Sequence, residues 1–132
     1  MKPPLWIEKR DVLAIHQQLL DLHGGAPGVR DEGLLESALA RLQQQFAYAS
    51  PNIVEMAAAY TAGIVRNHPF MDGNKRSGFV AGVLFLEMNG YAFTASEAEA
   101  AQAVLELAAG TIDPDGFAAF LRDRCQRAGR RR

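Results

Sequence analysis

The chain has 132 residues, 48% of them hydrophobic, which is the size of one compact domain with a single core and leaves no room for a second. Its one cysteine, Cys125, excludes an intrachain disulfide. Its longest apolar run, residues 79–86, is too short to span a membrane, and no leader pattern opens the sequence. We therefore expect a single cytoplasmic domain over residues 1–132. The net charge of −1 combines +5 over residues 122–132 with −6 over residues 1–121, which argues against a broad nucleic-acid surface.

The chain begins with an extended lead-in over residues 1–6, followed by a first helix over residues 8–23. Apolar residues recur there at helical spacing until the glycine pair 24–25 stops the pattern. His16 and His23 share a face of this helix, but no third ligand has the spacing of a zinc site. We interpret them as core-edge or surface histidines.

Three more helices are predicted in the middle of the chain. Residues 26–30 form a loop, after which Asp31 caps a second helix with an apolar face through residue 42. A third helix is expected over residues 53–67. A fourth, over residues 74–88, is apolar nearly all round, which predicts that it is the buried central helix of a bundle.

The remaining segments complete an all-α fold. Residues 91–94 are too short for more than an extended connector, and Ser96 with Glu99 has capping-box spacing at the start of a fifth helix. A sixth begins at the Asp-Pro pair 113–114, and the basic end, residues 127–132, is interpreted as a solvated tail. About six helices with short connections predict one all-α bundle.

The residues that carry chemistry are concentrated between the third and fourth helices, where residues 67–76 read Asn-His-Pro-Phe-Met-Asp-Gly-Asn-Lys-Arg. The residue before a proline avoids the helical region, so the third helix should end at His68. The Asp-Gly pair 72–73 predicts a turn. Asn74 is suited to cap the fourth helix, whose first amides would be those of residues 75–77.

This pattern predicts a phosphate-transfer site. N–H groups at a helix start bind anions, and Lys75 and Arg76 add positive charge that opposes the helix dipole unless an anion is bound. Asp72 would hold magnesium, His68 would take a proton from an attacking hydroxyl, and Phe70 is interpreted as a core anchor. The predicted nucleotide- and phosphate-binding residues are Gly73, Asn74, Lys75, Arg76 and Ser77.

The string resembles the signature of the Fic/Doc (Fido) family, His-x-Phe-x-(Asp/Glu)-Gly-Asn-(Gly/Lys)-Arg, with every defined position filled. Residues 24–31, 34–38 and 84–90 are also similar to the Doc, or "death on curing", toxin branch. The resemblance covers nearly the whole chain. It implies the Fic/Doc fold and a toxin that uses ATP and Mg²⁺.

Two positions depart from the Fic enzymes that transfer AMP. Those enzymes carry Gly after the motif Asn and a second Arg three residues after the first, whereas Lys75 and Phe79 stand here. Doc-type toxins share both changes, which implies transfer of the γ-phosphoryl group of ATP to a protein hydroxyl. The resemblance points to elongation factor Tu as the target and to translation arrest, with AMP transfer as the alternative reaction.

The resemblance also implies partners. Many Fic proteins carry an inhibitory (Ser/Thr)-x-x-x-Glu-(Gly/Asn) helix, but the only Glu followed by Gly or Asn here is Glu32, preceded at the required position by Gly28. A Phd-type antitoxin in trans is therefore implied, with a disordered segment that folds into an apolar groove near the first helix. The family's flap, which aligns the target peptide, is expected at Gln43, Gln44, Gln45, Phe46, Ala47 and Tyr48, and an ordinary loop is the alternative there.

Other site types lack their residues. A Walker phosphate loop fails because His68 stands where its first glycine should be and Asn74 separates Gly73 from Lys75. No His-Glu-x-x-His, Cys pair or Gly-x-Ser-x-Gly is present. The remaining alternative is a polar helix corner in a non-catalytic interaction domain. Such a corner would need the cap at Asn74, but nothing structural needs the motif's base, carboxylate and two cations together.

Overall fold

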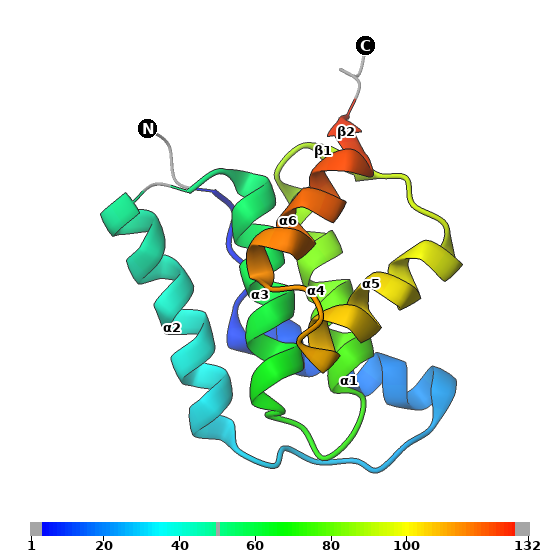
Figure 1. The fold of residues 1–132 in the computed structure, drawn as a ribbon. Helices are drawn as coiled ribbons and strands as arrows, with labels where there is room; N and C mark the ends of the chain where they lie inside the picture. The colour runs from blue at the N-terminus through cyan, green and yellow to red at the C-terminus, as the bar shows by residue number, and fades with distance from the viewer. Residues whose placement is uncertain (1–3, 50, 129–132) are drawn as a thin grey trace.

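The computed structural model describes residues 4–49 and 51–128, and this part of the chain forms the six predicted helices and one short pair of strands (Figure 1). The elements are α1 (Lys9–His23), α2 (Glu32–Ala49), α3 (Ile53–Asn67), α4 (Asn74–Met88), β1 (Tyr91–Phe93), α5 (Glu97–Ala109), α6 (Pro114–Asp123) and β2 (Cys125–Arg127). The all-α prediction is confirmed. In the described ranges, no helix is long and apolar enough to cross a membrane.

The bundle is centred on α3 rather than on α4, where the sequence had placed the centre. Helix α3 packs against α2, α4, α5 and α6, and it contributes more buried residues than any other described helix. Helix α4 packs on α3, α1, β1 and α5, but its residues Phe79, Val80, Val83 and Leu84 are only half-buried. The apolar run of α4 therefore serves both the core and a partly open surface.

Helices α3 and α4 approach closely because two glycines of α4 face α3. A Cβ added to Gly82 would lie 2.2 Å from Oγ1 of Thr61, and one added to Gly78 would lie 2.8 Å from a methyl carbon of Val65. The Thr61 hydroxyl donates to the Gly78 carbonyl oxygen at 2.8 Å. The two glycines thus permit the close helix contact.

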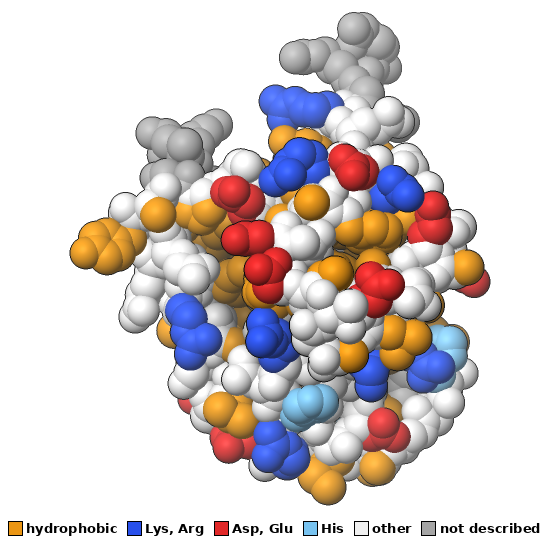
Figure 2. All heavy atoms as spheres, in the orientation of Figure 1, with side chains coloured by type: hydrophobic (Ala, Val, Ile, Leu, Met, Phe, Trp, Pro, Cys, Tyr) orange, Lys and Arg blue, Asp and Glu red, His pale blue; other side chains and the backbone are white. Residues whose placement is uncertain are grey.

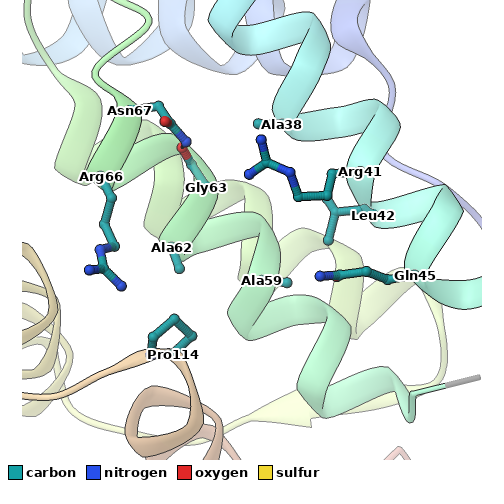
Figure 3. Close-up of a pocket in the computed structure, with 10 residues that line it drawn as sticks. All are labelled: Ala38, Arg41, Leu42, Gln45, Ala59, Ala62, Gly63, Arg66, Asn67 and Pro114. Carbon is teal, nitrogen blue, oxygen red and sulfur yellow. Dashed lines mark hydrogen bonds between the residues drawn. The ribbon is translucent and has the colours of Figure 1, made fainter. Parts of the chain in front are cut away.

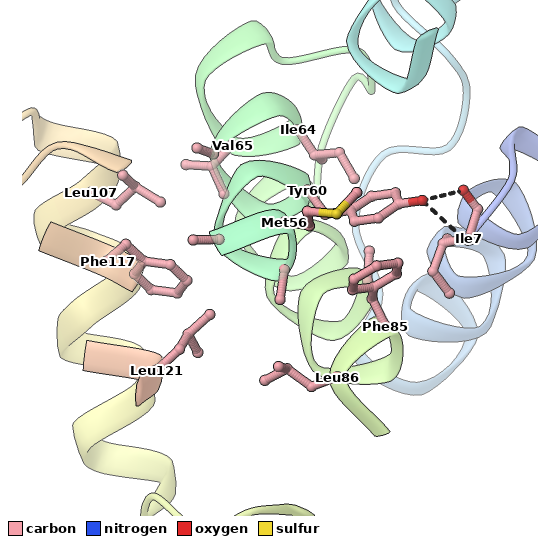
Figure 4. Packing of buried hydrophobic residues seen from close by; sticks show 14 of the residues in the cluster. Ile7, Met56, Tyr60, Ile64, Val65, Phe85, Leu86, Leu107, Phe117 and Leu121 are labelled. Carbon is pink, nitrogen blue, oxygen red and sulfur yellow. Dashed lines mark hydrogen bonds between the residues drawn. The ribbon is translucent and has the colours of Figure 1, made fainter. Parts of the chain in front are cut away.

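The lead-in to α1 is tied into the core by one buried tyrosine. The Tyr60 hydroxyl accepts from the Ile7 amide at 2.9 Å and donates to the Ile7 carbonyl oxygen at 2.8 Å (Figure 4). Burial raises the pKa of this phenol to about 12, so it stays protonated and can make both bonds. Next to it, Trp6 packs on Phe46 of α2 and Phe85 of α4.

The strand pair was not predicted from the sequence. Residues 91–93 are paired antiparallel with residues 125–127, with Tyr91 opposite Arg127 and Phe93 opposite Cys125. Each strand has only three residues and finds its partner far away in the chain, so local pattern carried no signal for it. Arg127 belongs to this pair rather than to a solvated tail, and residues 129–132 of the predicted tail lie outside the described residues.

Candidate functional site

The motif forms the connection between α3 and α4, at the end of the molecule opposite the N-terminal lead-in (Figure 1). Helix α3 ends at Asn67, and His68 follows as its C-cap in the left-handed region, with φ 51° and ψ 57°. Its backbone N–H still donates to the Ile64 carbonyl oxygen at 3.2 Å. The imidazole is exposed, as expected for a residue at a helix exit. The helix end that the sequence predicted at His68 is confirmed.

An arginine from another segment holds this helix end. Arg30 donates from Nε to the His68 carbonyl oxygen at 2.7 Å and from Nη2 to the Asn67 carbonyl oxygen at 2.9 Å. Both acceptors are carbonyls that a helix C-terminus leaves without intrahelical partners. The planar guanidinium therefore fixes the backbone on which the His68 side chain stands.

The segment that carries Arg30, residues 24–31, runs alongside the motif. The amides of Arg30 and Asp31 donate to the Pro69 carbonyl oxygen at 2.7 and 3.0 Å, and the Met71 amide donates to the Gly28 carbonyl oxygen at 3.1 Å. The sequence analysis gave this loop no role. A signal was present in its three glycines, at positions 24, 25 and 28, which all adopt positive φ here.

The buried side of the motif rests on α1. Phe70 is 1% exposed and stacks on His16, with ring centroids 3.7 Å apart and planes at 6°. Nε2 of His16 lies 2.8 Å from the Asp72 carbonyl oxygen and must carry the proton, since a carbonyl only accepts. His16 is thus a buried support of the motif. His23 is exposed at the end of the same helix.

Asn74 does not cap α4, which corrects the sequence prediction. Gly73 is the N-cap residue, in the left-handed conformation with φ 80°, and Asn74 is the first helical residue. The Asn74 side chain instead accepts from the Phe70 amide and donates to the Phe70 carbonyl oxygen, both at 3.0 Å. Its amide group therefore closes the turn and is not available to a ligand. Only the backbone N–H of Asn74 faces the helix end.

The first turn of α4 offers three amides, one position earlier than predicted. Helix geometry leaves the N–H groups of Asn74, Lys75 and Arg76 without intrahelical acceptors, whereas Ser77 N–H donates to the Gly73 carbonyl oxygen at 2.9 Å. Lys75 and Arg76 are exposed at this turn. Ser77 is fully buried, so neither its hydroxyl nor its amide reaches the surface of the site.

The Asp72 carboxylate is held from two sides. Its Oδ2 accepts from the Ala26 amide at 3.2 Å and its Oδ1 from the Gly73 amide at 2.8 Å. These two hydrogen bonds, helped by the charge of Arg76, lower the pKa of the carboxyl. A Cβ at Gly25 would lie 2.8 Å from Oδ2, so only glycine lets the loop pass this close. Asp72 is therefore ionised and accessible at neutral pH.

The structure contains no preformed all-protein metal cage in residues 4–49 and 51–128, since no group of three or more His, Cys, Asp or Glu side chains comes together there. Asp72 stands alone as the acidic residue of the motif. That arrangement fits magnesium, which is held by one or two carboxylates together with substrate phosphates.

Two adjacent cations, Lys75 and Arg76, stand at the start of α4, and Glu97 of α5 lines the cavity beside them. Figure 2 shows Lys and Arg side chains on several sides of one exposed histidine in the lower half of that face. Beside the motif, a cavity of about 320 Å³ between α4 and α5 is lined by Lys75, Arg76 and Phe79 together with Ala100 and Val104 of α5. It offers an apolar wall next to the two cations.

Gln43, Gln44, Gln45, Phe46, Ala47 and Tyr48 all lie inside α2, so the structure contradicts both an extended flap and a loop there. The amides of this segment are paired within the helix, and only the carbonyls from residue 46 onward lack intrahelical partners, so it offers no extended edge to a peptide. Its apolar pattern weakens after residue 42, which made it look like a loop. The segment that borders the motif with extended backbone is residues 24–31.

Comparisons with known proteins give a family and two relatives. The model of the Fic/DOC family matches residues 6–86, which include the motif and the loop beside it. The chain is 32% identical over 117 residues to the protein kinase doc of Escherichia phage P1, covering 88% of this chain and 92% of the relative. It is 35% identical over 120 residues to the toxin Doc of Mycolicibacterium smegmatis, covering 88% and 90%.

Proposed function

The chain belongs to the Fic/DOC family, and from that membership we propose that it is the toxin of a toxin–antitoxin module that transfers the γ-phosphoryl group of ATP to a hydroxyl of a protein target. One observation carries the proposal: His68, Asp72 and the cationic start of α4 all belong to the one exposed connection between α3 and α4. The relatives' names, a protein kinase and a toxin, support the same activity.

The residues divide the work between proton transfer and charge stabilisation. His68 takes the proton of the attacking hydroxyl, because its imidazole is exposed beside the helix start. The amides of Asn74, Lys75 and Arg76, with the two cationic side chains, hold the phosphate oxygens, where positioning and electrostatics supply most of the catalysis. Ser77 is left out of this set because it is buried.

Asp72 is the residue that would hold Mg²⁺. Its carboxylate is exposed and its pKa is lowered by the amides of Ala26 and Gly73, so it is ionised over the working pH range. Bound with the nucleotide, the ion would offset phosphate charge in the transition state. The two backbone hydrogen bonds keep the carboxylate in one orientation for this contact.

The choice between γ-phosphoryl and AMP transfer rests on Lys75 and Phe79, the two departures from the AMP-transferring pattern. Incubation with target and with ATP labelled separately at the α and γ phosphates separates the reactions. We expect γ-label in the product protein. Appearance of α-label would overturn the kinase assignment and support AMP transfer.

We propose elongation factor Tu, in the cytoplasm, as the target. Purified elongation factor Tu should take up γ-label from the intact protein and none from the His68→Ala variant. If no label enters the factor while another protein of a cell extract is labelled, the target assignment is wrong and the reaction assignment stands.

We propose a Phd-type antitoxin as the partner in trans. Beside the α4–α5 cavity, a second cavity of about 290 Å³ between α1 and α4 is lined by Ile15, Val80, Val83 and Leu84, and both cavities share Phe79. Together they give an apolar groove of the kind that accepts an amphipathic helix. Expression alone should arrest growth, and co-expression with a Phd-type antitoxin should restore it. Harmless expression of the intact protein at high level would contradict the toxin assignment.

A further inference from the structure

A separate cavity of about 330 Å³ lies on the other side of α3, between α2 and the start of α6 (Figure 3). Small side chains, such as those of Ala59 and Ala62, leave the space open, and Gly63 has no side chain at all. The polar part of the lining comes from Arg41 and Gln45 of α2 and from Arg66 and Asn67 of α3. None of the groups in the proposed transfer reaction lines this cavity.

The two arginines have no carboxylate partner in the described chain. The ion pairs of residues 4–49 and 51–128 join Lys9 to Glu32 and Glu36, and Arg124 to Glu99. Figure 3 shows the Arg41 side chain reaching from α2 toward the end of α3 that carries Asn67, and the Arg66 side chain reaching toward Pro114. No acidic residue lines the cavity. Two guanidinium groups therefore flank a space without a counter-charge.

Neighbouring polar groups do not supply the missing anion. The Asn67 amide group is bound to the Gly63 carbonyl oxygen at 2.6 Å. The start of α6 adds little positive field, because the Asp113 carboxylate caps it by accepting from the Gly116 amide at 2.8 Å. The attraction for an anion thus comes from Arg41 and Arg66 themselves.

The cavity adjoins the proposed base. Asn67 lines it and directly precedes His68, and the wall from Gly63 to Asn67 spans only about 6 Å of helix axis. An extended peptide advances about 3.3 Å per residue. A side chain two or three residues from a hydroxyl at His68 would therefore reach the space between the arginines.

We infer that this cavity receives an acidic side chain, Asp or Glu, of the protein substrate, two or three residues from the phosphorylated hydroxyl. The inference rests on the proposed function and names a determinant of its substrate choice. Guanidinium groups bind carboxylates through paired N–H donors, and the Ala-lined floor suits the methylene stem of the acid. The phosphates of the nucleotide have their own cations at the start of α4.

A titration that needs no catalysis tests the pocket. N-acetyl-glutamate N-methylamide should shift the backbone NMR signals of Arg41, Arg66 and Asn67 at millimolar concentration, and the matching glutamine compound should not. Arg41→Gln and Arg66→Gln should each abolish the shifts, while Arg122→Gln, at the far end of α6, should keep them. Equal shifts with both compounds, none with either, or saturation of these signals by ATP with Mg²⁺ would overturn the inference.

Kinetics on the protein that accepts the γ-label give the second test. Arg41→Gln and Arg66→Gln should each raise the KM for that protein about three- to tenfold and leave kcat and the KM for ATP within about twofold, and Arg41→Glu should raise it further. A fall in kcat with unchanged KM would overturn the substrate-docking role. Because the titration is independent of label transfer, failure of the proposed reaction and failure of the pocket are seen separately.

Discussion

The middle and the motif end of the α3–α4 pair are held together in different ways. Midway along the pair, Gly78 and Gly82 bring the helix backbones close, and the contacts are steric, with one buried hydroxyl from Thr61. At the motif end, the chain between the helices is held by hydrogen bonds from outside the pair, given by Arg30 of the loop and His16 of α1. The first region depends on shape and the second on polar groups.

The difference separates stability from chemistry. Close packing tolerates almost no change of volume, so the glycine contact of α3 with α4, at Gly78 and Gly82, should control whether the domain folds. The motif end exposes its base, its carboxylate and its cations, and its backbone is fixed by a few bonds whose single loss costs little. Variants in the two regions should therefore affect different measurements.

The largest effect is expected at His68. His68→Ala should lower the rate of phosphoryl transfer about 10²- to 10⁴-fold, because the general base is lost, while nucleotide binding and urea unfolding stay close to the wild type. His68→Gly is the matched variant, because glycine adopts φ 51° freely and should stabilise the fold by about 1 kcal/mol at the same loss of rate. Loss of ATP binding through unfolding in His68→Ala would show that the residue is structural.

A substitution at the glycine contact of α3 with α4 should have the largest effect on folding. Gly82→Ala would put a methyl group 2.2 Å from Oγ1 of Thr61 and 2.9 Å from the Ala57 carbonyl oxygen, so the helices must separate. We expect a loss of about 2–3 kcal/mol in the free energy of unfolding, measured in urea. Gly63→Ala is the control, since its new methyl group meets Ala38 at an ordinary 3.4 Å and should be neutral or stabilising. Equal losses in both would refute the steric account.

The sequence could predict the features that depend on neighbouring residues, but not those that depend on distant segments. Helix ends that depend on neighbouring residues were predicted: Asp31, Ser96 and Asp113 each cap a helix start through their own side chains, and the exit at His68 follows from Pro69. Asn52 caps α3 in the same way but had not been assigned beforehand. Local chemistry is sufficient at such positions.

Features made by distant segments were missed for a physical reason. Asn74 has the right side chain for a cap, but that side chain makes its hydrogen bonds with the buried backbone of Phe70 instead. Three contacts join segments more than 30 residues apart: the hydrogen bond from His16 to the motif, the hydrogen bonds from Arg30 to the end of α3, and the strand pair that begins at Tyr91. No local pattern encodes such contacts.

A smaller effect is expected from the support beneath the motif. His16→Phe keeps a ring to stack on Phe70 but removes the donor to the Asp72 carbonyl oxygen, which should cost about 1 kcal/mol in the free energy of unfolding. The KM for ATP with Mg²⁺ should rise as the turn loosens. His23→Phe, at an exposed position of the same helix, is the control and should change neither value. An unchanged KM in His16→Phe would limit His16 to a packing role.

The smallest effect, and the one that distinguishes polar from steric support most directly, is the acid dependence of Asp72. Hydrogen bonds from Ala26 and Gly73 lower the pKa of this carboxyl in the folded state, so the unfolded chain binds its proton more readily than the folded one. The stabilisation is therefore present above about pH 4 and is lost as the pH falls through the lower, folded pKa. Asp72→Asn should be less stable than the wild type at neutral pH, and the gap should close in acid.

The dependence on salt shows which interaction causes the difference in stability between the wild type and Asp72→Asn. The two backbone hydrogen bonds lower the pKa of Asp72 more than the charge of Arg76 does. Salt screens the charge but not the hydrogen bonds, so the difference in stability between Asp72→Asn and the wild type should survive at high ionic strength. The destabilisation by Gly82→Ala should stay constant over the same pH range, since no titrating group takes part in its contacts. Urea unfolding of the three proteins between pH 2 and about pH 7 makes the comparison. A gap for Asp72→Asn that is independent of pH would mean that the carboxylate is held at the motif by shape alone.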